Sequence, residues 1–193
     1  MNYTVITAPA SEPVTLVEAK THLRIPTAET GEDSYITSLI SVATNTAENI
    51  LGKKLITQTL DLFYDKFPAC REFDLPFGKL QSVTHIKYYD VDNVERTLSS
   101  SIYQTDSTGL TGRIKLEYGE SFPDTRAGKL NSVAIRMIVG YGVANSVPTS
   151  IKQALLLLIA NWFENREPAL QGTLAQVPYT VELLLASHRL YFF

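Results

Sequence analysis

Apolar residues recur along this chain with two different periods, and the change of period divides the chain into three parts. Over roughly 16–23 and 33–51 they return every three or four positions, which predicts two helices. From residue 57 to 141 apolar and polar residues alternate, which predicts strands. After residue 142 the helical spacing returns. The pattern therefore predicts an α+β fold, with a small helical bundle (residues 1–56 and 142–193) and an inserted antiparallel β-rich block (57–141).

Residues at the ends of the first two helices supply start and stop signals. Thr15 and Glu18 fit a capping box before the first helix, and Pro26 ends that helix. Gly52 is placed to end the second helix as a C-cap. Residues 1–14 contain Pro and Ala, and we expect them to form an extended arm.

The β-rich block contains short segments of alternating residues separated by Gly and Pro. In LITQTLDLFYD, we expect Leu60 and Leu62 on one side and Asp61 on the other. Further candidate strands are REFDL, SVTHIKYYD, VERTL, IYQTD, RIKLEY and SVAIRMIVGY. In the last of these, a shared face is predicted for Val133, Ile135, Met137 and Val139.

The two longest helices have unusual surfaces. The polar face of the second helix carries many Ser, Thr and Asn residues and few charges, which fits either contact with another protein or a solvated face. The segment VPTSIKQALLLLIANWFENREP is apolar on nearly every side, so we expect a helix that is buried all round. It is either the central helix of the bundle or shared between core and subunit interface. Its main stripe consists of Ile151, Ala154, Leu155, Leu158, Ile159 and Trp162.

The composition of the chain disfavours several classes of function. The 193 residues include 17 Lys and Arg against 20 Asp and Glu, for a net charge of -3. Tight binding of nucleic acid needs an excess of basic residues, so this charge disfavours it. Passive passage of DNA past the protein is compatible with this charge. No apolar run reaches the ~18 residues of a membrane span, and the N-terminus lacks the features of a signal peptide. We expect a soluble protein made in a cytoplasm, with no membrane partner.

Candidate chemistry is sparse. Cys70 is the only cysteine, so no intrachain disulfide forms. His22, His85 and His188 lie on three different elements, which disfavours a zinc site. No phosphate-binding loop or nucleophile elbow occurs, and Gly140-Tyr-Gly142 fits a turn. We therefore assign no catalytic residue, no metal ligand and no cofactor.

The segment Asp90-Val-Asp92-Asn93 resembles the start of a calcium loop. Such a loop needs an oxygen ligand at its fifth position, Gly at its sixth and Glu at its twelfth. This chain has Val94, Glu95 and Ser101 there. A hairpin turn between two strands is the better interpretation.

Several short sequence segments occur in an order that is similar to that of a known protein family. LITQT, LQSVT, GYG, VP-x-x-I-x-QALLLL and W-F-ENRE follow one another at characteristic distances, after the helical segment EPVTLVEAKTHLRI. Over about residues 8–190 the chain is similar to the head–tail connector (adaptor) proteins of tailed bacteriophages and prophages. The family has no catalytic residues that could be assigned to positions of this chain.

The resemblance implies a structural protein of the virion neck, assembled in the cytoplasm of a bacterial host. Roughly a dozen subunits would form a ring that docks below the portal protein and offers a platform to tail or neck proteins. DNA would pass through without tight binding. The helices would form the ring body. On this reading our candidate subunit contacts are Ser38, Ser41, Asn45, Leu190, Tyr191, Phe192 and Phe193.

Three other readings are weighed against the connector. The nearest is a neck or tail-completion protein of the same particle. An enzyme with an unrecognised site in the β-rich block would need a paired nucleophile and base, and the sequence offers none. A DNA-binding accessory factor would need a basic cluster, whereas Lys53-Lys54 is the only adjacent basic pair.

Overall fold

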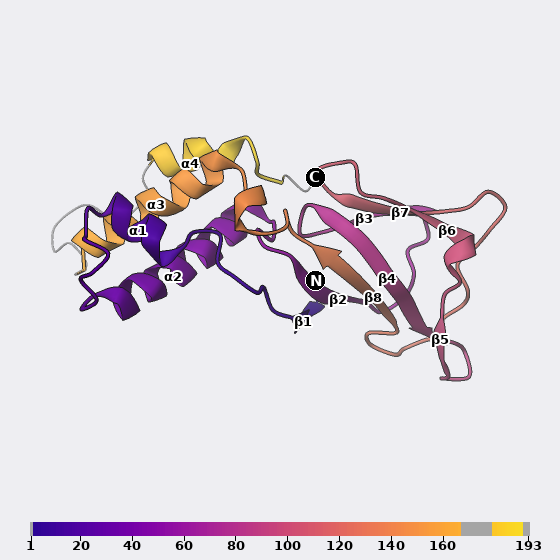
Figure 1. The fold of residues 1–193 in the computed structure, drawn as a ribbon. Coiled ribbons are helices and arrows are strands. Elements are labelled where there is room, and N and C mark those ends of the chain that lie inside the picture. The colour runs from indigo at the N-terminus through magenta and orange to yellow at the C-terminus, as the bar shows by residue number, and fades with distance from the viewer. Residues whose placement is uncertain (1, 167–178, 191–193) are drawn as a thin grey trace, which may run out of the picture. The chain divides into compact units, whose positions relative to one another are not determined.

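The computed structural model describes residues 2–166 and 179–190, and its helices and antiparallel strands confirm the predicted α+β class (Figure 1). The chain groups into two compact units: a sheet unit of residues 1–10 and 57–140, and a helical unit of residues 11–56 and 141–193. The strands are β1 (Asn2–Thr7), β2 (Gln58–Tyr64), β3 (Glu72–Leu75), β4 (Leu80–Tyr89), β5 (Glu95–Thr97), β6 (Tyr103–Asp106), β7 (Gly112–Leu116) and β8 (Val133–Val139). The helices are α1 (Leu16–His22), α2 (Asp33–Leu51), α3 (Thr149–Glu164) and α4 (Tyr179–Ala186).

The N-terminal segment corrects the predicted division of the chain. We expected residues 1–14 to be an arm of the helical part, but β1 pairs antiparallel with β2, so residues 1–10 belong to the sheet unit. Val5 pairs with Leu60, and Tyr3 pairs with Leu62. The β-branched residues of β1 suit a strand, and its backbone groups find partners on β2. The pairing partner is far away along the chain, so local pattern did not reveal it.

The sheet unit contains two antiparallel sheets, with strand orders β1-β2-β8-β4-β5 and β3-β7-β6. The alternation predicted for β8 is confirmed, because Val133, Ile135, Met137 and Val139 are all buried. They share a core with Leu60 and Leu62 of β2, as expected for the inner face of that strand. The small sheet adds Leu75 and Ile114 to the same core. The outer face of the large sheet carries polar side chains, among them the ion pair of Asp61 and Arg136 at 2.7 Å.

The helical unit begins with the predicted capping box. The Thr15 hydroxyl accepts a hydrogen bond from the Glu18 backbone, and the Glu18 carboxylate accepts one from the Thr15 backbone at 2.7 Å. Gly52 ends α2 with φ +66, a left-handed conformation that glycine adopts without steric cost. Both ends therefore follow from local sequence.

A buried lysine fixes the loop between α1 and α2. Lys20 is 2% exposed, and its ammonium donates to the carbonyl oxygens of Thr27 (3.1 Å) and Glu29. It also forms an ion pair with Asp33 at 2.7 Å. A buried cation is tolerated only where such partners replace its water shell, and here they tie the loop to the start of α2.

Helix α3 is enclosed largely by its own unit. Ile151, Ala154, Leu155, Leu158 and Ile159 are buried in one core with residues of α2 and α4. Leu156, Leu157, Trp162 and Phe163 are half-buried against the same core. The exposed residues of α3 are all polar, namely Thr149, Gln153 and Glu164. Of our two expectations, the central helix of the bundle therefore describes α3 best. No helix in the described ranges is both long and apolar enough to cross a membrane.

Candidate subunit-contact surface

The exposed side of α2 is a stripe of small, uncharged residues. Ser38, Ser41 and Asn45 are all exposed, and their spacing of three and four places them on one side of the helix. Val42 lies among them and is 50% exposed. We call Ser38, Ser41, Val42 and Asn45 the α2 stripe. Small side chains of this kind allow another backbone to approach closely.

Hydroxyl groups on this helix already have hydrogen-bond partners within it. Ser38 donates to the carbonyl oxygen of Ser34 at 3.0 Å, and Thr46 donates to that of Val42 at 2.9 Å. Burying an unpaired polar group costs free energy, whereas a donor that is already paired loses less when water leaves. Within the α2 stripe this lowers the cost of desolvating Ser38.

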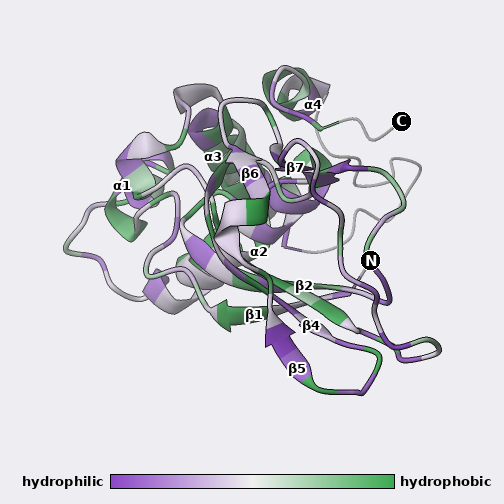
Figure 2. Ribbon diagram, turned by 90° about the vertical axis from the view of Figure 1, so that its right-hand side faces the viewer, coloured by the Kyte–Doolittle hydropathy of each residue, from purple (hydrophilic) through white to green (hydrophobic). Residues whose placement is uncertain are grey.

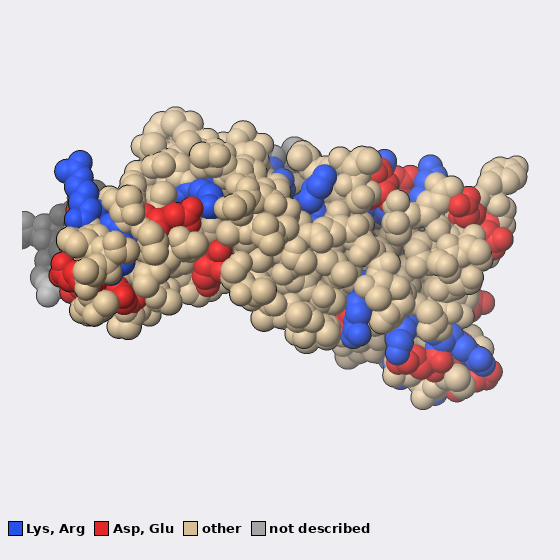
Figure 3. All heavy atoms as spheres, viewed as in Figure 1, with Lys and Arg blue, Asp and Glu red and all other residues tan. Residues whose placement is uncertain are grey.

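Charges are confined to the two ends of α2. Asp33 and Glu48 are the only ionisable carboxylates of the helix, and it has no Lys or Arg. Glu48 is engaged locally, because it accepts hydrogen bonds from the Lys54 ammonium at 2.8 Å and the Leu55 backbone at 2.9 Å. Figure 3 shows few charged side chains over the middle of α2. A contact on the α2 stripe would not require burial of an ion.

The C-terminal segment meets the end of α2. The backbone N–H of Leu190 donates to the carbonyl oxygen of Leu51 at 2.9 Å, and the Leu190 side chain is half-buried. Tyr191, Phe192 and Phe193, our other candidate contacts in this segment, lie outside the described residues. One predicted contact residue of the tail is thus placed beside α2.

A second contact holds this segment on the first turn of α3. The Ser150 hydroxyl and His188 Nε2 are 2.9 Å apart. Burial of His188, together with the nearby positive charge of Lys53, lowers the pKa of the imidazole. Both effects favour the neutral form of the ring, which can act as a hydrogen-bond partner. Sequence reasoning did not find this pair, because its two residues are 38 positions apart.

The structure places the residues considered for chemistry apart from one another. His22 ends α1, His85 lies on β4, and His188 follows α4. Cys70 is exposed and lines an open hollow of about 410 Å³ between residues 66–71 and 120–125. None of the residues that line this hollow is a histidine. In residues 2–166 and 179–190, no three His, Cys, Asp or Glu side chains gather closely enough to hold a metal ion.

The interpretation of residues 90–93 as a hairpin turn is confirmed. The Asp90 carboxylate accepts hydrogen bonds from the backbones of Asp92 (3.1 Å) and Val94 (2.9 Å). Asn93 takes a positive φ of 64°, which suits a tight turn. Strands β4 and β5 pair on either side of it.

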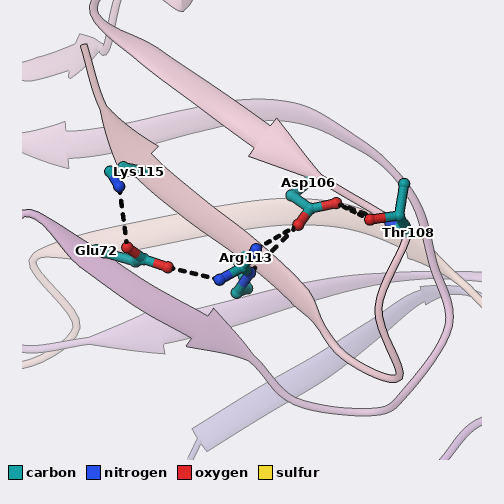
Figure 4. A network of polar contacts seen from close by, with 5 residues as sticks. All are labelled: Glu72, Asp106, Thr108, Arg113 and Lys115. Carbon is teal, nitrogen blue, oxygen red and sulfur yellow. Dashed lines mark hydrogen bonds and ion pairs between the residues drawn. The ribbon is translucent and has the colours of Figure 1, made fainter. Parts of the chain in front are cut away.

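A polar network on the small sheet was not predicted (Figure 4). Arg113 on β7 bridges Glu72 of β3 at 2.9 Å and Asp106 of β6 at 2.6 Å, and Lys115 lies 3.5 Å from Glu72. Hydrogen bonds from Thr108 and then from Arg113 lower the pKa of the Asp106 carboxyl. The alternation in GRIKL was a usable signal, since it places Arg113 and Lys115 on one face. These side chains are half-exposed or exposed, so solvent screens the pairs and each contributes little to stability.

Comparison with known proteins gives one family and several similar folds. A family described as phage gp6-like head-tail connector protein matches residues 13–111, about half of the chain, which includes the whole α2 stripe. A chain in the virion of a native gene transfer agent (GTA) particle is 23% identical, with a TM-score of 0.82. Chains in the neck of an empty GTA particle computed with C6 symmetry and in the neck of a native GTA particle computed with C12 symmetry are each 22% identical, with TM-scores of 0.81 and 0.77.

Each of these three likenesses covers 100% of this chain and 97% of the other chain. At this identity they show that the fold is shared along the whole length. No curated protein matches the chain.

Proposed function

Because the chain belongs to the family of phage gp6-like head-tail connector proteins, we propose that its copies join side by side into a ring in the neck of a phage-like particle. The observation that carries the proposal is the α2 stripe, an exposed helix side without charge. A ring needs one surface to meet a different surface of the next copy, and such head-to-tail contacts close when the angle permits. The particle necks with a similar fold are described with C6 and C12 symmetry, which supports a cyclic arrangement.

The physical basis of the subunit contact is close approach without the burial of a charged side chain. Ser38, Ser41 and Asn45 are short, so a neighbouring element can pack near the α2 backbone. Val42, which is 50% exposed, adds apolar area, and burying such a side chain fully contributes roughly 1.5–3 kcal/mol. The C-terminal residues from Leu190 to Phe193 form the second part of the proposed contact.

In this proposal the ring lies between the portal protein of the head and the tail or neck proteins, after assembly in the host cytoplasm. DNA passes through it without tight binding, in keeping with a net charge of -3. The protein works as a structural part and performs no turnover. Protein purified without added metal is expected to contain no stoichiometric zinc or calcium by elemental analysis, and a stoichiometric metal would contradict this part of the proposal.

The ring is tested on the particle itself. DNA-filled heads of the cognate particle that lack this protein are mixed with it and imaged. Ser41→Arg places a long charged side chain on the α2 stripe, and we expect it to remove ring density at the portal vertex. Gln153→Arg, at an exposed position of α3, is the matched control and should leave the density intact.

The outcomes separate the parts of the proposal. If the wild-type protein never adds to the portal vertex while another neck protein does, the connector position is wrong. If Ser41→Arg and Gln153→Arg behave alike, the α2 stripe is not the contact. Deletion of residues 190–193 should weaken the ring density, and unchanged density would remove the tail from the contact.

A further inference from the structure

The outer edge of β1 forms one margin of the five-stranded sheet. β1 is the first strand of the five-stranded sheet and pairs on one side with β2; no strand of the described ranges pairs with its other side (Figure 1). In antiparallel pairing, alternate residues direct their N–H and C=O groups away from the neighbour, so about half of this strand presents them outward. All six residues of β1 are exposed.

The two edges of this sheet are built differently. Proteins protect exposed edges with charge, proline or very short strands. β5, at the opposite edge, has three residues and carries Glu95, paired with Lys87, and Arg96, paired with Asp90. β1 has the sequence NYTVIT, with neither charge nor proline. Figure 2 shows this contrast as a green tip on β1 and a purple β5.

Exposed apolar side chains lie near this margin of the sheet. Val5 pairs with Leu60, which is fully buried, so Val5 lies on the inner face of the sheet, yet it is 44% exposed. Ile6 lies at a bulge in the pairing and is 45% exposed. On the same face as Val5, the Tyr3 ring packs against Phe77, with centroids 4.6 Å apart. A strand added beside β1 would extend this inner face and cover Val5.

We propose that the outer edge of β1 accepts an extended segment of a different protein of the particle neck, which adds to the sheet as a further strand. The inference rests on the proposed function, because it needs a neck in which other proteins are neighbours. Main-chain hydrogen bonds would supply affinity, and side chains at alternate positions would supply selectivity. The segment that fits is uncharged, with β-branched or apolar residues opposite Val5.

A second copy of this chain fits the edge less well. The other edge strands described, β3, β5 and β6, have only three or four residues each. Pairing of β1 with β1 of another copy needs a two-fold axis between them, which a simple cyclic ring does not have. One added strand also buries far less than the ~1,200 Å² of a stable interface, so the partner must be held nearby by other contacts. An assembled neck provides that proximity.

The experiment places the same charge on the two faces of β1. Val5→Lys directs a lysine to the inner face, where an added strand would bury it; in the free chain it can reach water because the site is half-exposed. Thr4→Lys is the matched control, since Thr4 pairs with Asp61 on the outer face and the new lysine stays in solvent. Both variants are first checked for wild-type circular dichroism and melting temperature.

Each variant is then added to cognate DNA-filled heads that lack this protein, together with the remaining neck and tail proteins. We expect Val5→Lys to form the ring at the portal vertex but to yield roughly tenfold fewer completed particles, with Thr4→Lys near wild type. Amide exchange of residues 4–7 should be roughly tenfold slower in completed particles than in the free protein or in heads bearing the ring alone.

Two results would overturn the inference. Equal completion by Val5→Lys, Thr4→Lys and wild type shows that the edge is not used. Protection of residues 4–7 in the ring alone assigns the edge to a second copy. If Val5→Lys does not fold, the exchange comparison on the wild-type protein decides by itself. Absence of any ring with wild-type protein is a separate result, which counts against the proposed function.

Discussion

Replacing Gly112 with alanine should destabilise the sheet unit through a steric conflict with Leu80. A Cβ added at Gly112 would lie 2.5 Å from Leu80 Cδ2, 2.6 Å from its Cβ and 2.9 Å from its Cγ. Carbon atoms in contact prefer separations of about 3.5–4.0 Å. Rotation of the Leu80 side chain can move Cδ2 and Cγ away, but Cβ is fixed to the β4 backbone. The conflict is therefore relieved only by a shift of β4 or β7.

The expected loss of stability follows from two opposing contributions, overpacking of the core and replacement of a glycine in a strand. Overpacking of a core that forces backbone shifts costs about 1–3 kcal/mol. Glycine in a strand is itself unfavourable by about 0.5–1 kcal/mol relative to alanine, which offsets part of the loss. We expect Gly112→Ala to lower the free energy of unfolding by about 1–2 kcal/mol. Equilibrium unfolding in urea, followed by circular dichroism, measures the change.

The matched control is Gly31→Ala. No atom lies within 4 Å of a Cβ added there, and its φ is not in the left-handed region, so stability should stay the same or rise by up to about 1 kcal/mol. If Gly112→Ala is as stable as the wild type while Gly31→Ala behaves as expected, the close approach of β7 and β4 is wrong. A loss in both variants would point to a general effect of alanine.

Three further predictions concern the helical unit. Trp162 is half-buried against the core, so Trp162→Ala should cost about 2 kcal/mol, less than the ~3–5 kcal/mol of a fully buried aromatic, as measured by thermal unfolding. Burial alone would raise the pKa of Glu18, but hydrogen bonds from Lys152 and the capping residue outweigh it and lower that pKa. Its contribution is therefore present above the unfolded pKa of about 4.3 and is lost as pH falls, so Glu18→Gln should flatten the acid limb of stability against pH. Burial and the charge of Lys53 lower the pKa of His188, so NMR titration should give a pKa below 6.5, and Lys53→Met should raise that pKa. As pH falls through 6.5 the unfolded chain takes up the proton first, so the free energy of unfolding declines.

Local sequence was sufficient where an element is determined by its own residues. The capping pair Thr15 and Glu18, the glycine that ends α2 and the alternation in β8 all act within one element. Their physical causes are short-range hydrogen bonds and the burial of one face, both of which sequence periodicity displays. The predicted turn at residues 90–93 belongs to the same class.

Interactions between distant segments could not be read in this way. The pairing of β1 with β2 and the position of β8 between β2 and β4 depend on which strands meet, and alternation alone does not choose partners. Lys20 stands in a helical segment like any solvent-exposed lysine, and only the folded loop shows the carbonyl oxygens that surround it. The hydrogen bond of Ser150 with His188 likewise depends on tertiary contact.

The candidate contact surface could be predicted from the sequence only in part, because helical spacing shows which residues share a side of a helix but not which sides are packed. Helical spacing was enough to place Ser38, Ser41 and Asn45 on one exposed side of α2. It was not enough to decide whether α3 also had a free apolar face, since that depends on α1, α2 and α4 packing around it. The only exposed residues of α3 are polar, so α2 is the better candidate for the contact between subunits.

The two surfaces proposed for assembly differ in chemistry, and this difference makes their roles separable. The α2 stripe offers small, uncharged side chains, so a neighbour gains from close packing there and loses when a charge is added. At the outer edge of β1 no strand of the described ranges pairs, so an added strand gains from main-chain hydrogen bonds and is excluded by a charge on the inner face only. Ser41→Arg should therefore stop ring formation and everything that follows it. Val5→Lys should leave the ring and stop a later step, and a particle that fails at the same stage with both variants would contradict this division.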